Sequence, residues 1–255
     1  MNTADALVDT HCHIDLFERP REVFAEAEQQ HVFTIAVTNA PSVFEHTERL
    51  VEGSTYVRAA LGLHPELVST HAAELAQFRS LIGKTRYIGE VGLDYVTSDA
   101  KDRENQRKVF ASILEWCAED GRKIITVHSR RAAKDVVAAV GDSFPGSVIL
   151  HWFTGTPSEL EAASRCGLYF SVNPAMAGSP RGRSLIAMMA PDRVITETDG
   201  PFVQIRKRVA RPVDVTQVLT ILASIWRVDE DEARVIVLAN FRRLVKRNES
   251  GNVLI

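Results

Sequence analysis

The segment VDTHCHID, residues 8–15, carries two histidines that stand one residue apart. Side chains two residues apart on a β-strand point to the same side, so an extended stretch from Leu7 to His13 would aim His11 and His13 at one point. Neutral imidazole is the commonest metal ligand among side chains, and this arrangement therefore suits a metal ion. An exposed polar strand end would carry the same residues, so the metal interpretation depends on further ligands elsewhere in the chain.

Further residues of ligand type recur along the chain, each at or near the end of a short apolar segment. They are His64 in GLHP, Glu90 in GEVGLDY, His128 in VHSRR, His151 in LHWFTG and Asp199 in TETDGPF. Taken singly, such a histidine is ordinarily a satisfied core residue and such an acid ordinarily lies on the surface. Their agreement in position is what indicates a common site.

Short apolar segments rich in β-branched residues alternate with amphipathic segments of helical length. The predicted strands cover residues 6–9, 32–37, 56–62, 86–91, 123–128, 147–152, 168–172 and 193–198. The predicted helices include residues 21–30, 103–121, 156–167, 213–226 and 229–247. Gly121 and Gly167 should end two of these helices, and Thr156 or Ser158 should cap the start of one.

Eight strands alternating with helices over 255 residues favour an α/β fold of the (β/α)₈ class, a TIM barrel forming a single domain over residues 1–255. A doubly wound open sheet is the competitor, but it usually has a glycine-rich turn after its first strand, where this chain has THCH. The carboxyl ends of barrel strands open onto one mouth, where the ligand-type residues would meet. Such a set exceeds the needs of one four-coordinate ion and suits two divalent metal ions, Mg²⁺, Mn²⁺ or Zn²⁺, with Glu90 as the bridge.

The bulk composition, with 45% hydrophobic and 25% charged residues, is typical of soluble globular proteins. Apolar runs are too short to span a membrane, and no signal peptide is evident, so we expect a cytoplasmic location. The net charge of −3 gives no global basic field, although residues 204–211 and 241–247 are basic clusters. The three separated cysteines predict reduced thiols, with Cys12 filling the core.

In order along the chain, these motifs resemble the signature of the TatD-type metal-dependent deoxyribonucleases, barrel members of the amidohydrolase superfamily. The matching segments are VDTHCHID, GLHP, IGEVGLDY, VHSRRA, HWFTG and TETDGPF, and NFRRLV resembles the closing Asn-x-x-Arg-Leu helix of that family. The resemblance implies hydrolysis of DNA phosphodiester bonds by a metal-activated water, typically exonucleolytic. DNA, as single strands or ends, would be the substrate.

Matched motif by motif, the resemblance also implies roles for individual residues. One metal would be held by His11, His13, Glu90 and Asp199, and the second by Glu90, His128 and His151. Glu90 and Asp199 would be catalytic, with Asp199 accepting the proton of the attacking water. His64 would contact the substrate phosphate, and Arg130 would clamp it or form a salt bridge at the rim. Asp94 and Tyr95 would brace the mouth.

The chain departs from the family pattern after the late aspartate. Gly200 stands where the family usually has serine, and QIRKRVARPVDV replaces an Asn-Glu-Pro loop. The basic run could attract phosphate in place of a loop that shapes the site. In this region the chain resembles TatD-like members of bacterial Qat anti-phage systems, which travel with an ATPase and a QueC-like protein, so protein partners of that kind are expected.

Two other function classes stay open. One is a different amidohydrolase chemistry, such as a lactonase, a phosphotriesterase or a cyclic amidase. Many of these bridge their metals with a carboxylated lysine, whereas this chain offers Glu90, and Lys123 begins its strand. The other is a scaffold without activity, which the complete ligand set argues against. Trp152 and Phe153 could stack on a base, although packing under a loop is their ordinary role.

Overall fold

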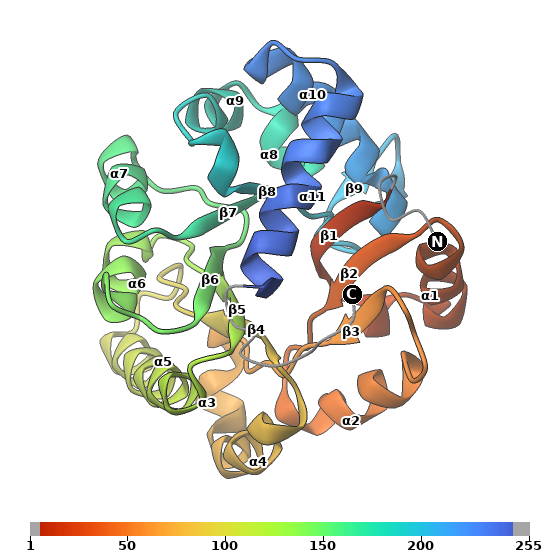
Figure 1. Cartoon of the computed structure of the whole chain (residues 1–255). Helices are drawn as coiled ribbons and strands as arrows, with labels where there is room; N and C mark the ends of the chain where they lie inside the picture. The colour runs from red at the N-terminus through yellow and green to blue at the C-terminus, as the bar shows by residue number, and fades with distance from the viewer. Residues whose placement is uncertain (1–5, 247–255) are drawn as a thin grey trace.

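In the computed structural model, which describes residues 6–246, parallel strands form a ring that helices surround (Figure 1). The ring strands are β1 Leu7–Cys12, β2 Val32–Ala36, β3 Val57–Ala59, β4 Tyr87–Gly92, β5 Ile124–His128, β6 Ser147–Leu150, β7 Tyr169–Val172 and β8 Val194–Thr196. Every predicted strand is present, and β1 extends three residues further than expected, to Cys12. The expected TIM-barrel class is confirmed.

Two hydrogen-bonded sheets, β1-β2-β3 and β4-β5-β6-β7-β8, make up the ring. At the seam between β3 and β4, Leu61 pairs with Ile88 as an isolated parallel bridge. At the other seam, the backbone N–H of Asp199 donates to the carbonyl of His11 at 2.8 Å. The carboxyl ends of β8 and β1, which carry two of the predicted ligands, are therefore tied together.

Helices follow most of the strands and cover the outside of the ring. They are α1 Pro20–Gln29, α2 Pro41–Leu50, α3 Val68–His71, α4 Leu75–Leu81, α5 Ala100–Asp120, α6 Ala133–Val140, α7 Pro157–Arg165, α8 Pro174–Gly178, α9 Pro180–Ile186, α10 Val215–Trp226 and α11 Glu230–Lys246. The predicted capping pattern of α7 is a full capping box between Thr156 and Glu159. Gly121 ends α5 with a left-handed φ of 69°. Residue 247, the last of the predicted final helix, and residues 1–5 lie outside the described range.

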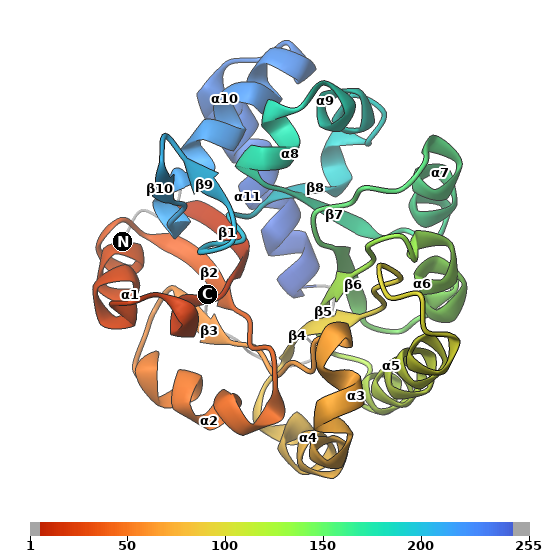
Figure 2. The same cartoon turned by 180° about the vertical axis from the view of Figure 1, so that it is seen from behind.

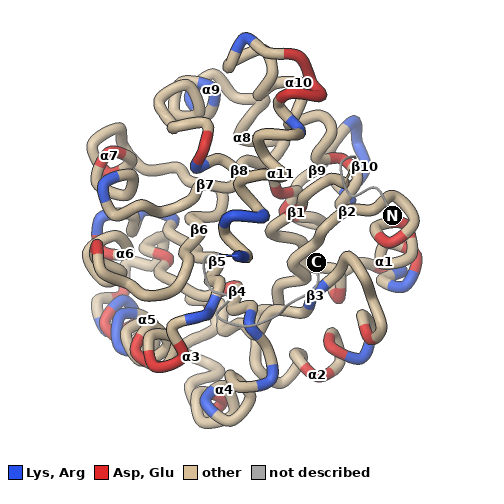
Figure 3. Tube along the Cα trace, viewed as in Figure 1, with Lys and Arg blue, Asp and Glu red and all other residues tan. Residues whose placement is uncertain are grey.

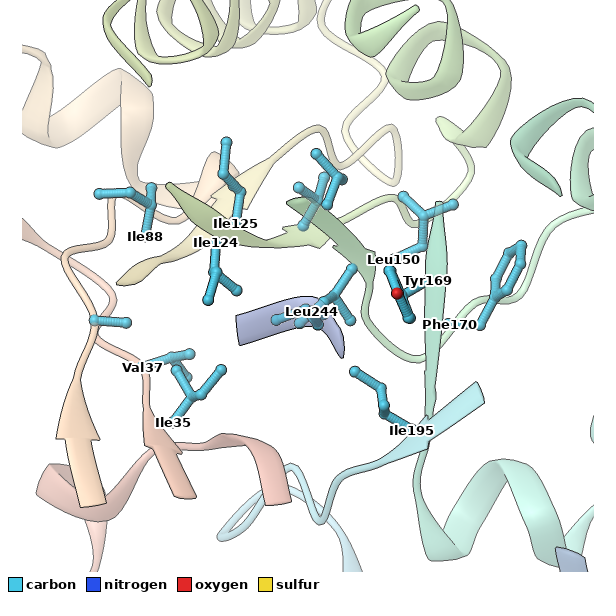
Figure 4. Packing of buried hydrophobic residues seen from close by; sticks show 14 of the residues in the cluster. Ile35, Val37, Ile88, Ile124, Ile125, Leu150, Tyr169, Phe170, Ile195 and Leu244 are labelled. Carbon is cyan, nitrogen blue, oxygen red and sulfur yellow. The ribbon is translucent and has the colours of Figure 1, made fainter. Parts of the chain in front are cut away.

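The main hydrophobic core lies inside the ring and between the ring and its helices. Figure 4 shows Leu244 of α11 among Ile35, Ile124 and Ile195, which come from three different strands. All four side chains are buried, and each contributes about 1.5–3 kcal/mol to the free energy of unfolding. Since α11 crosses one end of the ring, the opposite end, where the strands finish, is free for the predicted site (Figures 1 and 2).

The basic segment after β8 forms a small antiparallel hairpin, β9 Gln204–Ile205 and β10 Arg208–Val209, which the sequence did not predict. Figure 2 shows this hairpin close to β1, on the face opposite α11, and Figure 3 shows basic residues gathered at its turn.

Within residues 6–246, no helix combines the length and apolar character needed to cross a membrane.

Candidate metal centre

The two histidines of the first motif do face one point. Nε2 of His11 lies 3.2 Å from Nε2 of His13, and each of these atoms lies 3.4 Å from Oε2 of Glu90. Oδ1 of Asp199 lies 3.8 Å from the first nitrogen and 3.7 Å from the second. The structure therefore brings together all four side chains that were predicted to hold the first metal.

The other oxygen of Glu90 faces a second set of histidines. Oε1 lies 2.6 Å from Nδ1 of His128, 3.1 Å from Nε2 of His151 and 3.4 Å from Nε2 of His64. The residues predicted for a second metal are thus also adjacent, and His64, predicted to contact substrate, lies beside them. A carboxylate that presents its two oxygens to two groups of imidazoles has the geometry of a bridge.

Burial and mutual charge determine the ionisation of the central acids. Burial alone would raise the pKa of Glu90, but His64, His151 and His11 outweigh it and hold that pKa well below its usual range. Burial raises the pKa of Asp199 well above its usual range, with His151 opposing this shift and Glu90 adding to it. The cluster thus contains one firmly ionised carboxylate and one that readily holds a proton.

The second ring nitrogen of three histidines faces a polar partner. Nδ1 of His11 lies 2.8 Å from Oγ1 of Thr126, Nε2 of His128 lies 2.7 Å from Oδ2 of Asp94, and Nδ1 of His151 lies 3.4 Å from Oε2 of Glu197. Metal-binding histidines usually have such a partner, because it fixes the tautomer and the direction of the ring. These contacts direct the remaining ring nitrogens toward Glu90.

Glu197 and Thr126 were missed by the sequence interpretation. Glu197 stands two residues before Asp199, and Thr126 stands two residues before His128. This spacing places each near a predicted ligand but does not reveal which histidine it contacts. Asp94, expected only to brace the mouth, contacts His128 directly.

Tyr95 has the bracing role that was expected for it. Its hydroxyl donates to Oδ2 of Asp135 at 2.7 Å, and the Arg103 guanidinium lies 5.0 Å from the centre of its ring. These contacts tie the segment after β4 to α5 and α6.

The donor set fits divalent cations. The ligand atoms fall into three overlapping groups, namely His11, His13 and Asp199; His11, Glu90 and His151; and His64, Glu90 and His128. Burial, with the neighbouring His151, lowers the pKa of His11 to about 3, so its ring is neutral and its lone pair is available to a cation. Imidazole nitrogens and carboxylate oxygens without thiolates suit Zn²⁺, Mn²⁺ or Mg²⁺.

Comparison with known proteins agrees with this geometry. The family model for the TatD related DNases matches residues 8–246. The chain belongs to this family. It is therefore a metal-dependent hydrolase of the DNase class, as its motifs implied.

Individual relatives span most or much of the chain. An uncharacterized metal-dependent hydrolase of Methanocaldococcus jannaschii is 26% identical, over 94% of this chain and 97% of that protein. The 3'-5' ssDNA/RNA exonuclease TatD of Pantoea vagans is 30% identical, over 66% of this chain and 67% of that protein. The crystal structure of YJJV, a TatD homologue from Escherichia coli, superposes with a TM-score of 0.84 at 24% identity, covering 94% of this chain and 98% of that one, and supports the fold.

A cavity of about 470 Å³ opens over the metal-binding candidates of this TatD-family hydrolase. Its lining includes Asn39, His64, Arg130, Trp152 and Phe202. Arg130 is exposed there, and within residues 6–246 its guanidinium forms no ion pair, so the salt bridge considered for it is not present. A larger cavity of about 680 Å³, lined by residues of β2, β3 and α11, contains none of the ligand-type residues.

The two aromatic residues after His151 lie in different environments. Phe153 is fully buried and packs edge-on against Phe170 with ring centres 5.5 Å apart, so it belongs to the core. Trp152 is partly buried and lines the cavity.

Cys12 is fully buried, which confirms its predicted place in the core.

Proposed function

We propose that this TatD-family hydrolase uses two divalent metal ions to remove nucleotides from single-stranded DNA ends. The observation that carries the proposal is the position of Glu90, whose two oxygens face two separate groups of imidazoles. The Pantoea relative is a 3'-5' exonuclease of single-stranded DNA and RNA by name, which supports exonuclease action here.

The ligand sets follow the two oxygens of Glu90. One ion would be held by His11, His13, Glu90 and Asp199, and the other by Glu90, His128 and His151. When bound, such ions lower the pKa of water and neutralise charge on a phosphoryl group. His64, which lies 3.4 Å from Glu90, could instead complete the second set.

The chain's own residues would supply proton transfer and substrate placement. Asp199 would accept the proton of the attacking water, because its Oδ1 lies 3.8 and 3.7 Å from the His11 and His13 nitrogens of the first ligand set and its side chain lines the cavity. His64 and Arg130 both line the cavity and would contact the phosphate, Arg130 as a bidentate clamp.

The decisive experiment adds Mg²⁺, Mn²⁺ or Zn²⁺ back to metal-stripped protein with single-stranded DNA labelled at either end. We expect metal-dependent release of nucleotides, with a product ladder that reports the direction of digestion. Loss of a residue that only supports a metal ligand reduces activity by up to about 100-fold. Because Glu90 would itself be a ligand, Glu90→Ala should reduce the rate by more than this. Glu66→Ala is the matched control, because Glu66 lines the same cavity without belonging to a ligand group.

Stoichiometric metal binding without cleavage of any DNA would contradict the proposal. Lactones and phosphotriesters, the substrates of the competing amidohydrolase chemistries, would then be tested in the same assay. If none of them were hydrolysed, a requirement for a protein partner would be tested next.

We further propose that the nuclease acts in a Qat-type anti-phage system, together with an ATPase and a QueC-like protein. The support is the segment after Asp199, where Gly200 and the β9–β10 hairpin depart from the usual family pattern. Phage plating on cells that carry the operon tests this role. Glu90→Ala in the operon should abolish protection, and unchanged protection would contradict a role for the metal centre.

A further inference from the structure

The hairpin after β8 is attached directly to the loop that carries Asp199. The backbone N–H groups of Phe202 and Val203 both donate to the carbonyl of Asp199, at 2.9 and 3.1 Å. Gly200 allows the closing end of the hairpin to approach this loop, because a Cβ at this position would lie only 2.2 Å from the carbonyl oxygen of Ala210. The hairpin is therefore fixed in position relative to the metal-centre candidates.

The hairpin is also anchored on its inner side. Its buried side chains are Val203, Ile205 and Ala210, and Trp152 of the cavity wall packs against them. Arg208 forms two hydrogen bonds of 2.7 Å with the carboxylate of Asp214. Arg208 thus serves to hold the hairpin, and the basic residues left for other contacts are those of the turn.

Phe202 presents an aromatic surface beside the metal-centre candidates. Its side chain is 59% exposed and lines the cavity. Its ring meets that of His13 edge-on, with ring centres 5.0 Å apart and an angle of 83° between the planes. Exposure of a large apolar ring at this place is unfavourable in water, and a nucleobase that stacked on the ring would cover it.

The turn of the hairpin places two charges at its tip. Arg206 and Lys207 have φ values of 48° and 68°, the left-handed pair that a tight hairpin turn requires. Asn-Gly is the favoured sequence for such a turn, so an Arg-Lys pair there carries a conformational cost. Within residues 6–246 neither side chain forms an ion pair, so both charges are open to solvent.

We propose that Phe202 and the hairpin turn form a binding track for single-stranded nucleic acid leading to the metal centre. A base would stack on Phe202, and phosphates further along the strand would contact Arg206 and Lys207. The turn begins four residues after Phe202, so it lies at most about 13 Å away, the length of four extended residues, which a few nucleotides can span. This assignment rests on the proposed function, because it supplies the route by which a strand reaches the metal ions.

The test measures binding of fluorescein-labelled oligodeoxythymidylate with phosphorothioate linkages, which resist cleavage, to the metal-loaded protein over a range of salt concentrations. Phe202→Leu removes the aromatic face and should raise the Kd about tenfold, whereas Phe202→Trp should keep the wild-type Kd. Arg206→Asn combined with Lys207→Gly preserves the turn while removing both charges. This pair should reduce the slope of log K against log salt by about 1.4, since each phosphate contact on a single strand contributes about 0.7.

Arg227→Asn is the matched control, because Arg227 is also an exposed arginine with positive φ, 60°, but lies at the end of α10. Thermal melting and the metal content of each variant establish that fold and metal centre are intact. An unchanged Kd in Phe202→Leu together with an unchanged salt slope in the double variant would overturn the track. Because the readout is binding, these losses are measurable even if no DNA is cleaved, so failure of the track and failure of the proposed chemistry are distinguishable.

Discussion

Nδ1 of His151 lies 3.4 Å from Oε2 of Glu197, while Nε2 of the same ring lies 3.1 Å from Oε1 of Glu90. Glu197 is fully buried and also accepts hydrogen bonds from the backbone of Trp152 and the side chain of Asn173, each at 3.0 Å. Burial alone would raise the pKa of Glu197, but His151, with His11 and the hydroxyl of Ser171, outweighs it and holds that pKa below its ordinary value. Glu197 is therefore a buried charge that orients His151.

Replacing Glu197 with glutamine should weaken metal binding while leaving the fold intact. The amide keeps an acceptor for its hydrogen-bond donors but removes the charge that orients the His151 ring. Titration with Mn²⁺ should resolve two binding events. In one of them we expect the affinity to fall 10- to 100-fold, the usual effect of removing the partner of a metal-binding histidine. Glu161→Gln, on the exposed side of α7, is the control, and wild-type affinity in Glu197→Gln would contradict the positioning role.

Replacing Thr126 with valine tests the other half of the centre. Oγ1 of Thr126 lies 2.8 Å from Nδ1 of His11, and valine keeps the shape without the hydroxyl. The ring nitrogen would lose its partner in the interior, so the free energy of unfolding should fall by about 1–3 kcal/mol. Affinity should fall for the Mn²⁺ ion that Glu197→Gln leaves unaffected. If both variants weakened the same binding event, the assignment of two separate ligand sets would be wrong.

The control for this variant is Thr34→Val. Thr34 is buried on β2 like Thr126 on β5, but its hydroxyl donates to the backbone carbonyl of Val32, away from the histidines. It should lose stability without losing metal affinity.

The sequence was sufficient to predict His11, His13 and Asp199 as neighbours, because residues at the carboxyl ends of barrel strands meet at one mouth. It was not sufficient for Glu197 and Thr126, since their roles depend on which ring nitrogen faces them across the barrel. That information lies in contacts between different strands, which periodicity along one strand does not contain.

The hairpin was missed for a different reason. Each of its strands, β9 and β10, is only two residues long, and its turn is Arg206-Lys207 in place of the Asn-Gly or Asp-Gly that signals such turns. What stabilises it is tertiary, namely the packing of Val203 and Ile205 against Trp152. Local sequence preference therefore pointed to a loop where packing produces a hairpin.

Glu28 should make the stability of the barrel pH-dependent at a place remote from the metal centre. Its carboxylate accepts hydrogen bonds from Oγ of Ser54 and from the backbone N–H groups of Thr55 and Tyr56, the latter two at 3.2 and 2.8 Å. Partial burial acts to raise the pKa of Glu28, but these hydrogen bonds outweigh it and lower the pKa. The ionised form is favoured by folding, so its stabilising contribution is present above the ordinary pKa of about 4.3 and is lost as pH falls through the folded-state value.

Glu28→Gln should accordingly reduce the free energy of unfolding by about 1 kcal/mol at neutral pH. The difference from wild type should shrink as the pH falls below the ordinary pKa of about 4.3 and through the lower folded-state pKa, where the wild-type carboxyl also becomes neutral. Urea unfolding at neutral and acidic pH measures both values. Glu22→Gln, in the same helix, serves as control, and a difference that stayed constant with pH would show that the charge of Glu28 is not the cause.

Gly200 was expected to replace a serine of the family pattern, and the structure gives a steric reason for glycine at this position. A Cβ at this position would lie 2.2 Å from the carbonyl oxygen of Ala210 and 2.9 Å from Cζ of Phe17. The first contact is with backbone, so it can be relieved only by moving the end of the hairpin away from the loop of Asp199. The position of the hairpin end beside the Asp199 loop therefore requires glycine at residue 200.

Gly200→Ser should lower the free energy of unfolding by about 1–3 kcal/mol, the usual cost of overpacking. It should also speed trypsin cleavage after Arg206 and Lys207, because the displaced hairpin loses its support on the Asp199 loop. Thermal melting and timed proteolysis with mass spectrometry measure the two effects. Gly83→Ser is the matched control, since a Cβ at Gly83 meets nothing within 4 Å. If Gly200→Ser had the melting temperature and the trypsin cleavage rate of the wild type, the close approach of Ala210 would not be what holds the hairpin beside Asp199.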